Sequence, residues 1–201
     1  MTAQPAKERV LSASYWQLVR AAGKLFEERD YHQTSVRDIA DAVGMTSGSF
    51  FYHFATKEDV LVAVLEHGMI DGLEVARKRM EGVEGSRNRL HALIHGHLEA
   101  LHSQNTYAHK VWLRDWQQVS PAKRPALERL SRSYRDIWRA VLDEARREGL
   151  IASDTEFFRR MAVGALNWTV HWVRAPGKRQ VKELADQFTQ AFLNEPGAHP
   201  K

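Results

Sequence analysis

The chain has 201 residues, no cysteine and a formal net charge of +4. The lack of cysteine excludes disulfides, thiolate catalysis and cysteine-ligated zinc. No apolar run approaches the ~20 residues that a membrane span needs, and Met1 to Arg9 lacks the apolar stretch of a signal peptide. We therefore expect a cytoplasmic protein with no membrane partner.

The positive charge is not concentrated in the first part of the chain. Residues 1–60 contain seven Lys/Arg against eight Asp/Glu. Charge alone therefore does not identify a polyanionic partner, and the sequence motifs must decide.

A first helix is predicted from Ser14 to about Arg29. Its apolar residues recur at helical spacing and should pack across the segment that follows: Leu18, Ala21, Ala22, Leu25 and Phe26. Asp30 comes next, and aspartate can adopt a left-handed cap conformation.

A short second helix is predicted just after Thr34. Ser35 can cap it, with Asp38 as an acidic capping-box partner. Gly44 ends it, because glycine adopts the left-handed conformation without steric cost. The apolar stripe of this helix consists of Val36, Ile39, Ala40 and Val43.

A third helix is predicted to start at a cap on Thr46 or Ser47 and to run to Phe54, with Phe50 and Phe54 facing inward. Two short helices joined by a turn that contains glycine are typical of a helix-turn-helix. The second helix of such a pair enters the major groove of DNA.

The remaining pattern is helical throughout. A fourth helix is predicted from Thr56 to about Met80, with Asp59 as a capping-box partner. Glycine, serine and proline breaks then divide the chain into five more helices, at about 87–102, 107–118, 122–148, 154–174 and 178–193. The fold class is therefore all-α.

The segment from Thr34 to Glu58 resembles the DNA-binding half of the TetR family of bacterial transcriptional repressors. The residues that carry the resemblance are Thr34 to Ala40, Gly44, Ser47-Gly48, Tyr52-His53-Phe54 and Thr56-Lys57-Glu58. It implies an N-terminal three-helix helix-turn-helix domain over residues 1–60, with the helix at 56–80 as a connection. A larger C-terminal helical domain for ligand binding and dimerisation would occupy residues 81–201.

The resemblance also implies which residues contact DNA. Small residues at the start of the third helix, together with Arg37, would read bases, while Tyr52, His53 and Lys57 would contact the phosphate backbone. Local packing is the alternative for Tyr52 and His53, and plain solvation is the alternative for Lys57. The complete predicted set is Ser35, Arg37, Thr46, Ser47, Gly48, Ser49, Tyr52, His53 and Lys57.

Tryptophan is concentrated in the C-terminal part of the chain, where it indicates either ordinary core or an aromatic-lined ligand cavity. The predicted ligand-binding set is Trp112, Trp116, Trp138, Asn167, Trp168, His171 and Trp172. The segment from Gly164 to Trp172 also resembles family members that answer to acyl-CoA thioesters. In that case arginines would meet the phosphates: Arg114, Arg159, Arg160 and Arg174.

The resemblance further implies a homodimer, because the last two long helices of family members pair with their symmetry mates. The predicted contacts are Phe157, Met161, Leu184, Phe188 and Phe192, with intrachain core as the alternative. We expect no cofactor and no metal site, since the histidines at 91, 95, 97 and 102 have only Glu99 as a nearby carboxylate.

The predicted function is a ligand-responsive transcriptional repressor that binds a palindromic double-stranded operator and is released by a small apolar or acyl-CoA-like effector. An activator or a corepressor-dependent regulator is the alternative within this class. A helical carrier or small enzyme that has kept the fold is the alternative from another class. We expect no enzymatic activity, because no catalytic set is recognisable in the order of the residues.

Overall fold

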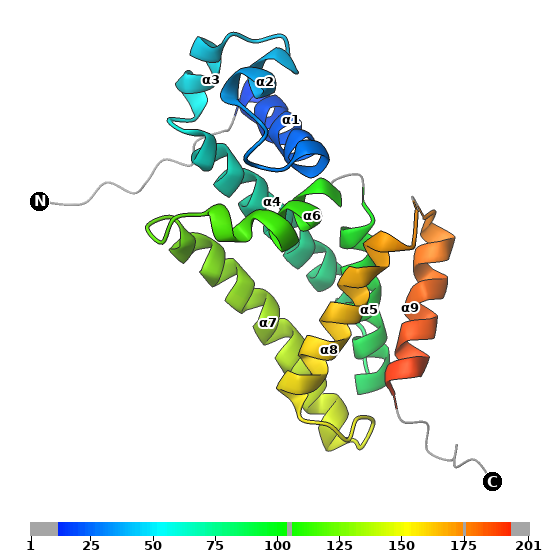
Figure 1. Cartoon of the computed structure of the whole chain (residues 1–201). Helices are drawn as coiled ribbons and strands as arrows, with labels where there is room; N and C mark the ends of the chain where they lie inside the picture. The colour runs from blue at the N-terminus through cyan, green and yellow to red at the C-terminus, as the bar shows by residue number, and fades with distance from the viewer. Residues whose placement is uncertain (1–11, 104–105, 175, 194–201) are drawn as a thin grey trace, which may run out of the picture.

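The computed structural model describes residues 12–103, 106–174 and 176–193, and within these ranges it contains only helices and their connections (Figure 1). The all-α prediction is confirmed. The α-helices are α1 (Ala13–Arg29), α2 (Val36–Asp41), α3 (Ser47–His53), α4 (Lys57–Met80), α5 (Ser86–Leu101), α6 (Thr106–Asp115), α7 (Arg124–Arg147), α8 (Thr155–Trp168) and α9 (Lys178–Phe192). Two 3-10 helices, η1 (Trp116–Gln118) and η2 (Thr169–His171), extend α6 and α8.

Local capping signals set the ends of the N-terminal helices. The Ser35 hydroxyl accepts the Asp38 amide at 3.1 Å, and the Asp38 carboxylate accepts the Ser35 amide at 2.8 Å. The same reciprocal pair joins Thr56 and Asp59 at the start of α4. Gly44 has φ +67°, as its role as helix terminator requires.

Helices α1 to α3 form a small domain at one end of the molecule, and α4 runs from it into the larger half (Figure 1). Phe26, Ile39 and Phe50 are fully buried in this small domain, and Phe54 is nearly so. The same core continues into α4 through Val60 and Leu61, and into α6 through Tyr107 and Val111. The first core therefore joins the small domain to part of the larger half.

Helices α5 and α7 to α9 surround a second core. The far end of α4 joins it through Ala76, and Trp138 of α7 is completely buried in it. None of the described helices is long and apolar enough to cross a membrane.

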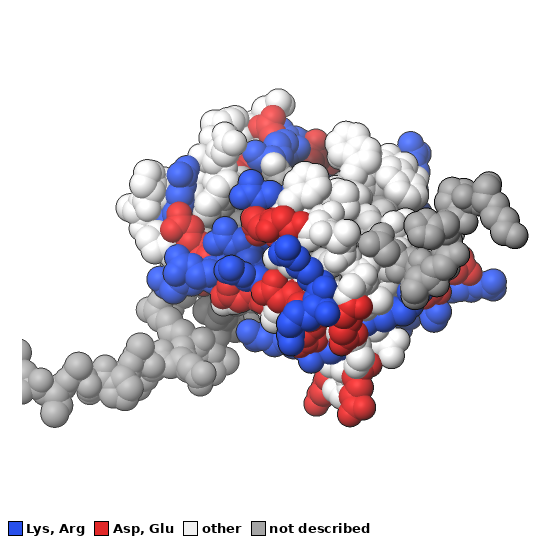
Figure 2. All heavy atoms as spheres, turned by 90° about the horizontal axis from the view of Figure 1, so that it is seen from below, with Lys and Arg blue, Asp and Glu red and all other residues white. Residues whose placement is uncertain are grey.

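The charges at the far end of the larger half are mixed. Figure 2 views the molecule from below, opposite the small domain, and shows positive and negative side chains interspersed over this face. A mixed face of this kind does not provide the single-sign field that attracts a polyanion.

Candidate DNA-binding surface and ligand cavity

Helix α3 presents one face to the core and one to solvent. Phe50 and Phe54 point inward, whereas Tyr52 is 85% exposed. At the start of the helix the Thr46 hydroxyl accepts the amide of Ser49 at 3.2 Å, so Thr46 is the N-cap. Thr46, Gly48 and Ser49 are exposed and Ser47 is half-buried. These small residues form an accessible surface at the helix N-terminus, where free backbone N–H groups attract anions.

The two predicted contacts on α2 differ in availability. The side chain of Arg37 is 84% exposed, and its Nε lies 3.6 Å from the carboxylate of Asp41 on the same helix. In contrast, the Ser35 hydroxyl accepts the Asp38 amide and donates to the Asp38 carboxylate at 2.6 Å. Arg37 is therefore available to a partner, whereas Ser35 is occupied as a helix cap.

Lys57 has an internal role that the sequence did not indicate. Its ammonium donates to the backbone carbonyls of Tyr31 and Thr34, each at 2.8 Å, and lies 4.2 Å from the centre of the Tyr31 ring. Partial burial lowers the pKa of Lys57. An ammonium has three donors, so one N–H remains for a further partner. His53 is half-buried, and its ring lies 5.0 Å from that of Tyr52.

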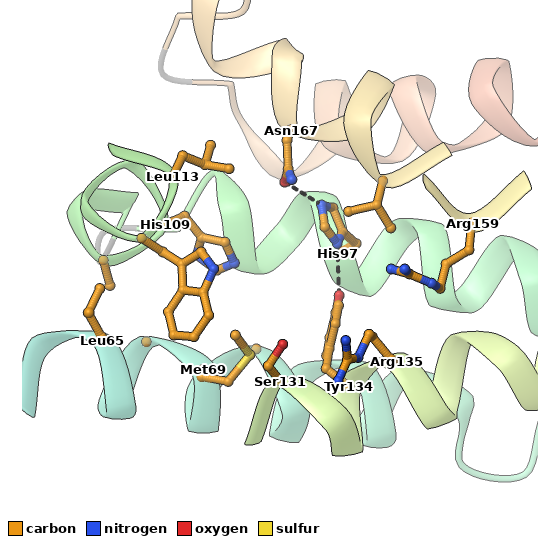
Figure 3. A pocket seen from close by; sticks show the side chains of 15 residues that line it. Leu65, Met69, His97, His109, Leu113, Ser131, Tyr134, Arg135, Arg159 and Asn167 are labelled. Atoms are coloured by element: carbon orange, nitrogen blue, oxygen red, sulfur yellow. Dashed lines mark hydrogen bonds between the residues drawn. The ribbon is translucent and has the colours of Figure 1, made fainter. Parts of the chain in front are cut away.

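A cavity of about 210 Å³ lies in the larger half, among α4, α5, α6, α7 and α8 (Figure 3). Its apolar lining is contributed mainly by α4 and α6. The lining residues are Leu65, Gly68, Met69, Gly72, His97, Ala108, His109, Trp112, Leu113, Ser131, Tyr134, Arg135, Arg159, Val163 and Asn167.

A polar chain crosses the cavity wall at His97. The Tyr134 hydroxyl donates to Nδ1 of His97 at 2.8 Å, and the Nε2–H of His97 donates to Oδ1 of Asn167 at 3.0 Å. Burial lowers the pKa of His97 to about 3 and raises that of Tyr134 to about 12. Both groups are therefore neutral at pH 7, and the chain ties α5 to α7 and α8 (Figure 3).

Two arginines line one side of the cavity. Arg159 of α8 bonds Glu156 twice, at 2.9 and 2.8 Å, and Arg160 bonds the same carboxylate at 2.8 Å. These arginines hold the pKa of Glu156 down, at about 2. Arg135 of α7 is exposed at this side of the cavity. Three guanidiniums thus accompany one carboxylate, which leaves a surplus of positive charge.

Only part of the predicted ligand-binding set lies at this cavity. Trp112 and Asn167 line it. Trp138 is fully buried in the second core, and Trp116 stacks on Trp112 at 4.8 Å without reaching the cavity. Near the end of α8 the aromatic side chains turn outward: Trp168, His171 and Trp172 are exposed.

The four predicted phosphate-binding arginines are also dispersed. Arg159 alone lines the cavity. Arg114 donates to the carbonyl of Phe26 and pairs with Asp115 at 3.0 Å. Arg160 and Arg174 are exposed, and Arg160 is paired with Glu156.

Residues that the sequence did not single out complete the site. Arg135 is one of many charged residues in the helix predicted at 122–148, and its neighbour Tyr134 belongs to no recognisable motif. His97 is one of four histidines whose spacing predicts no metal site, and nothing in the sequence indicates its hydrogen bonds to Tyr134 and Asn167. A spacing of three or four residues shows which side chains share a helix face, but not which neighbouring helix that face meets.

Helix α6 connects this cavity with the DNA-binding domain. Ala108 and Trp112 line the cavity, while Lys110 pairs with Glu27 of α1 and Arg114 donates to the carbonyl of Phe26. The ring of Tyr107 lies so close to Gly23 of α1 that an added Cβ would meet its Cδ2 at 2.2 Å. A shift of α6 toward α1 would therefore displace α1.

A second connection leads from α7 to the start of α4. The amide of Ser120 donates to the carboxylate of Glu58 at 2.7 Å, and Lys123 pairs with Asp59 at 2.7 Å. Burial raises the pKa of Asp59, whereas its hydrogen bonds to Lys123 and Thr56 lower it, and the net effect is a lowered pKa. The N-terminus of α4 is thus held both by the connection between α1 and α2 and by the segment that leads into α7.

Exposed apolar side chains form a stripe along α8. Phe157 is 62% exposed, Met161 44% and Trp168 63%, at spacings of four and seven residues. We call these three residues the α8 stripe. Of the three predicted contacts on α9, Leu184 is buried, whereas Phe188 and Phe192 are half-buried against the second core and lie 5.5 Å apart.

Several histidines of α5 have specific protein partners. His91 pairs with Asp186 of α9 at 2.7 Å, and His102 bonds Thr169 at 2.8 Å. Within the described ranges no group of three or more potential ligands is arranged to hold a metal ion.

Comparison with known proteins matches both halves of the chain. Residues 18–64 match the family model for bacterial regulatory proteins of the tetR family, and residues 84–195 match the model for the tetracyclin repressor-like C-terminal domain. The HTH-type transcriptional repressor KstR2 of Rhodococcus jostii (strain RHA1) is 30% identical over 200 residues, covering 96% of this chain and 97% of that protein.

Solved structures share the fold over nearly the whole chain. The superantigen PfiT has 34% sequence identity and a TM-score of 0.75, covering 90% of this chain and 97% of that one. AibR, in a complex with isovaleryl coenzyme A and operator DNA, has 22% identity and a TM-score of 0.80, covering 89% of this chain and 97% of that one.

Proposed function

The chain belongs to the TetR family of bacterial transcriptional regulators, and we propose that it is a dimeric repressor released from a palindromic operator by an acyl-CoA-like effector. One observation carries this proposal. The exposed start of α3 and the cavity lie in different halves of the chain, and α6 contacts both the cavity and α1. This arrangement allows occupancy of the cavity to alter the position of α3.

The proposed division puts DNA recognition in residues 1–60 and ligand binding with dimerisation in residues 81–201, with α4 as the connection. The α3 surface enters the major groove, where Thr46, Ser47, Gly48 and Ser49 approach base edges. The short side chains and the absent Cβ of Gly48 permit a close approach. Arg37 supplies the longer reach toward a base.

Contacts to the DNA backbone fall to side chains beside this surface. Tyr52 is the most exposed large side chain of α3, and its hydroxyl can donate to a phosphate. His53 and the remaining N–H of Lys57 lie at the junction of α3 and α4. Such contacts position the protein without reading sequence.

A second copy of this chain is the proposed partner of the α8 stripe. An exposed apolar patch of this kind marks an association surface. A two-fold dimer also places two copies of α3 at a fixed separation, which matches two half-sites one helical turn or a multiple apart. Phe157 and Met161 are the proposed central contacts, and Trp168 extends them.

The cavity supports an effector with an apolar chain and an anionic end. Leu65, Met69 and Val163 offer apolar surface, while Arg135 and Arg159 provide guanidiniums on one side. Arginine forks suit phosphate groups. An acyl-CoA combines both chemistries, since its acyl chain is apolar and its nucleotide carries phosphates.

Release follows if the effector favours a different position of α6. The ligand lies against Trp112 and Ala108 on one face of α6, and the contacts of Lys110 and Arg114 lie on the other face. A shift of α6 would move α1 and alter the spacing of the two recognition helices. Only a difference in ligand affinity between the two positions is needed.

A mobility-shift assay on DNA from beside the gene of this protein, repeated with a panel of acyl-CoAs, tests the proposal. We expect a shifted band that one class of acyl-CoA abolishes. A band that every acyl-CoA strengthens would indicate a corepressor instead. The absence of a shift at low salt on any nearby DNA would refute the repressor proposal.

A further inference from the structure

A second hollow lies behind His109. It has a volume of about 250 Å³ and is bounded by α4, the end of α5 and α6. Its described lining residues are Gly68, Asp71, Glu74, Val75, Ala100, Ser103 and His109. Gly68 and His109 line both this hollow and the ligand cavity, so the imidazole of His109 forms part of the wall between them.

The crossing of α4 and α6 fixes this wall. An added Cβ on Gly68 would meet the Cβ of Ala108 at 2.3 Å, so the two helices touch there without room for a larger side chain. One turn further along α4, an added Cβ on Gly72 would lie 3.9 Å from both Cε1 and Nε2 of His109. The imidazole therefore lies beside the backbone of α4 at Gly72, at van der Waals distance from where a side chain there would begin.

The wall stands opposite the cationic side of the cavity. Figure 3 shows Arg135 and Arg159 on one side and His109, with Leu65 and Leu113, on the other. An effector whose anionic part meets the arginines thus extends its apolar end toward the imidazole. The environments on the two sides of the ring differ, since the hollow beyond contains Asp71 and Glu74 whereas the cavity wall before it is mainly apolar.

The imidazole is suited to meeting an apolar chain end. Burial lowers the pKa of His109 to about 4, so the ring is neutral at pH 7. The cavity before it, about 210 Å³, is smaller than the ~300–1,000 Å³ typical of sites for drug-sized ligands. The small volume favours a short chain, and the neutral ring favours an apolar chain end.

We propose that His109 sets the maximum length of the acyl chain that the effector carries. The inference rests on the acyl-CoA-like effector of the proposed function. The effector class is a short-chain acyl thioester whose terminal carbon lies against the imidazole. Longer chains are excluded because their ends would have to displace the ring.

The test measures the affinity of the full chain for straight-chain acyl-CoAs from acetyl to palmitoyl by isothermal titration calorimetry. For the wild type, affinity should rise by up to about fourfold for each added methylene that becomes buried. It should then stop rising or fall at one chain length. In His109→Ala that limit should move to chains several carbons longer.

Two further variants separate the size of the ring from other effects. His109→Phe keeps a ring of similar size and should keep the wild-type limit. His95→Ala removes a half-buried histidine of α5 that lines neither hollow and should also keep it. Circular dichroism and operator binding without ligand establish that each variant is folded.

The results distinguish the inference from its premise. If short acyl-CoAs bind the wild type and His109→Ala keeps the same limit, the role of His109 is refuted while the effector class stands. The steric role is also refuted if His109→Phe behaves like His109→Ala. If no acyl-CoA binds the wild type, the proposed effector class fails, and the inference fails with it.

Discussion

The contact between α1 and α6 at Gly23 offers a quantitative test of how closely the two halves are joined. In Gly23→Ala the new methyl would lie 2.2 Å from Cδ2 of the Tyr107 ring, which is buried. Overpacking of this kind costs about 1–3 kcal/mol. Alanine in place of glycine within a helix returns about 0.5–1 kcal/mol. The difference of these two ranges is about 0–2.5 kcal/mol, and the close approach to a buried ring places the expected net loss of unfolding free energy in the upper half of that range.

The sign of the effect should reverse once the ring is removed. In a Tyr107→Ala background the added methyl meets no ring, so Gly23→Ala should stabilise the protein by about 0.5–1 kcal/mol through helix propensity alone. Urea denaturation of the four proteins gives the coupling as a double-mutant cycle.

Operator affinity provides a second measurement on the same proteins. Because Gly23→Ala pushes α6 away from α1, it should weaken DNA binding in the absence of any effector. If Gly23→Ala destabilises the protein equally in both backgrounds, the close contact between α1 and α6 is refuted.

Three further results are expected. Lys57→Ala should lower the unfolding free energy by about 1–2 kcal/mol, because the carbonyls of Tyr31 and Thr34 lose a charged donor. The same variant should reduce the slope of DNA affinity against salt concentration by about one. A variant as stable as the wild type would contradict the structural role of Lys57. Phe157→Glu should give monomers in sedimentation experiments, and an unchanged dimer would exclude the α8 stripe from the interface. Acid should destabilise the protein as the pH falls from about 6.5 toward 4. His97, which is buried, and His109, which is half-buried, are neutral in the folded protein with pKa values lowered to about 3 and about 4, so the unfolded chain takes up protons first. Each histidine contributes about 1.4 kcal/mol per pH unit to the slope of unfolding free energy against pH. Urea denaturation across this pH range should therefore give a smaller slope for His97→Gln than for the wild type. An equal slope for the two proteins would show that His97 is not buried in its neutral form.

The boundaries of the N-terminal helices were predictable because their signals are local, whereas the helix predicted at 154–174 ends at Trp168 and continues as the 3-10 helix η2. Ser35 with Asp38, and Thr56 with Asp59, satisfy helix N-termini within three residues, and the structure places both pairs as capping boxes. Gly44 adopts the positive φ that its position suggested, +67°. Asp30 also has a positive φ, +69°, but its ψ of 169° lies outside the left-handed helical region, so the expected left-handed cap is not formed there. Each of these features depends on a few neighbouring residues and not on the rest of the fold.

The cavity was predicted less well because it depends on contacts between distant helices. The periodicity of Trp168 and Trp172 showed only that they share a face, and that face is exposed. Trp138 fills the second core, whereas its neighbour Tyr134 reaches the cavity and bonds His97. The choice between core and cavity is made by the packing of five helices, which no short stretch of sequence records.

Helix α6 also explains why a strict division into domains is difficult to read from sequence. The charged residues Lys110 and Arg114 look like a solvated face in the sequence, yet they contact α1. Their partners are separated from them by more than eighty residues.

The coupling between cavity and DNA is tested most directly by titrating a fluorescently labelled operator with the protein, with and without a saturating acyl-CoA. Binding of that acyl-CoA is established independently by isothermal titration calorimetry. We expect the operator affinity to fall at least about tenfold, a coupling free energy of about 1.4 kcal/mol or more. An acyl-CoA that occupies the cavity and leaves operator affinity unchanged would contradict ligand-responsive repression.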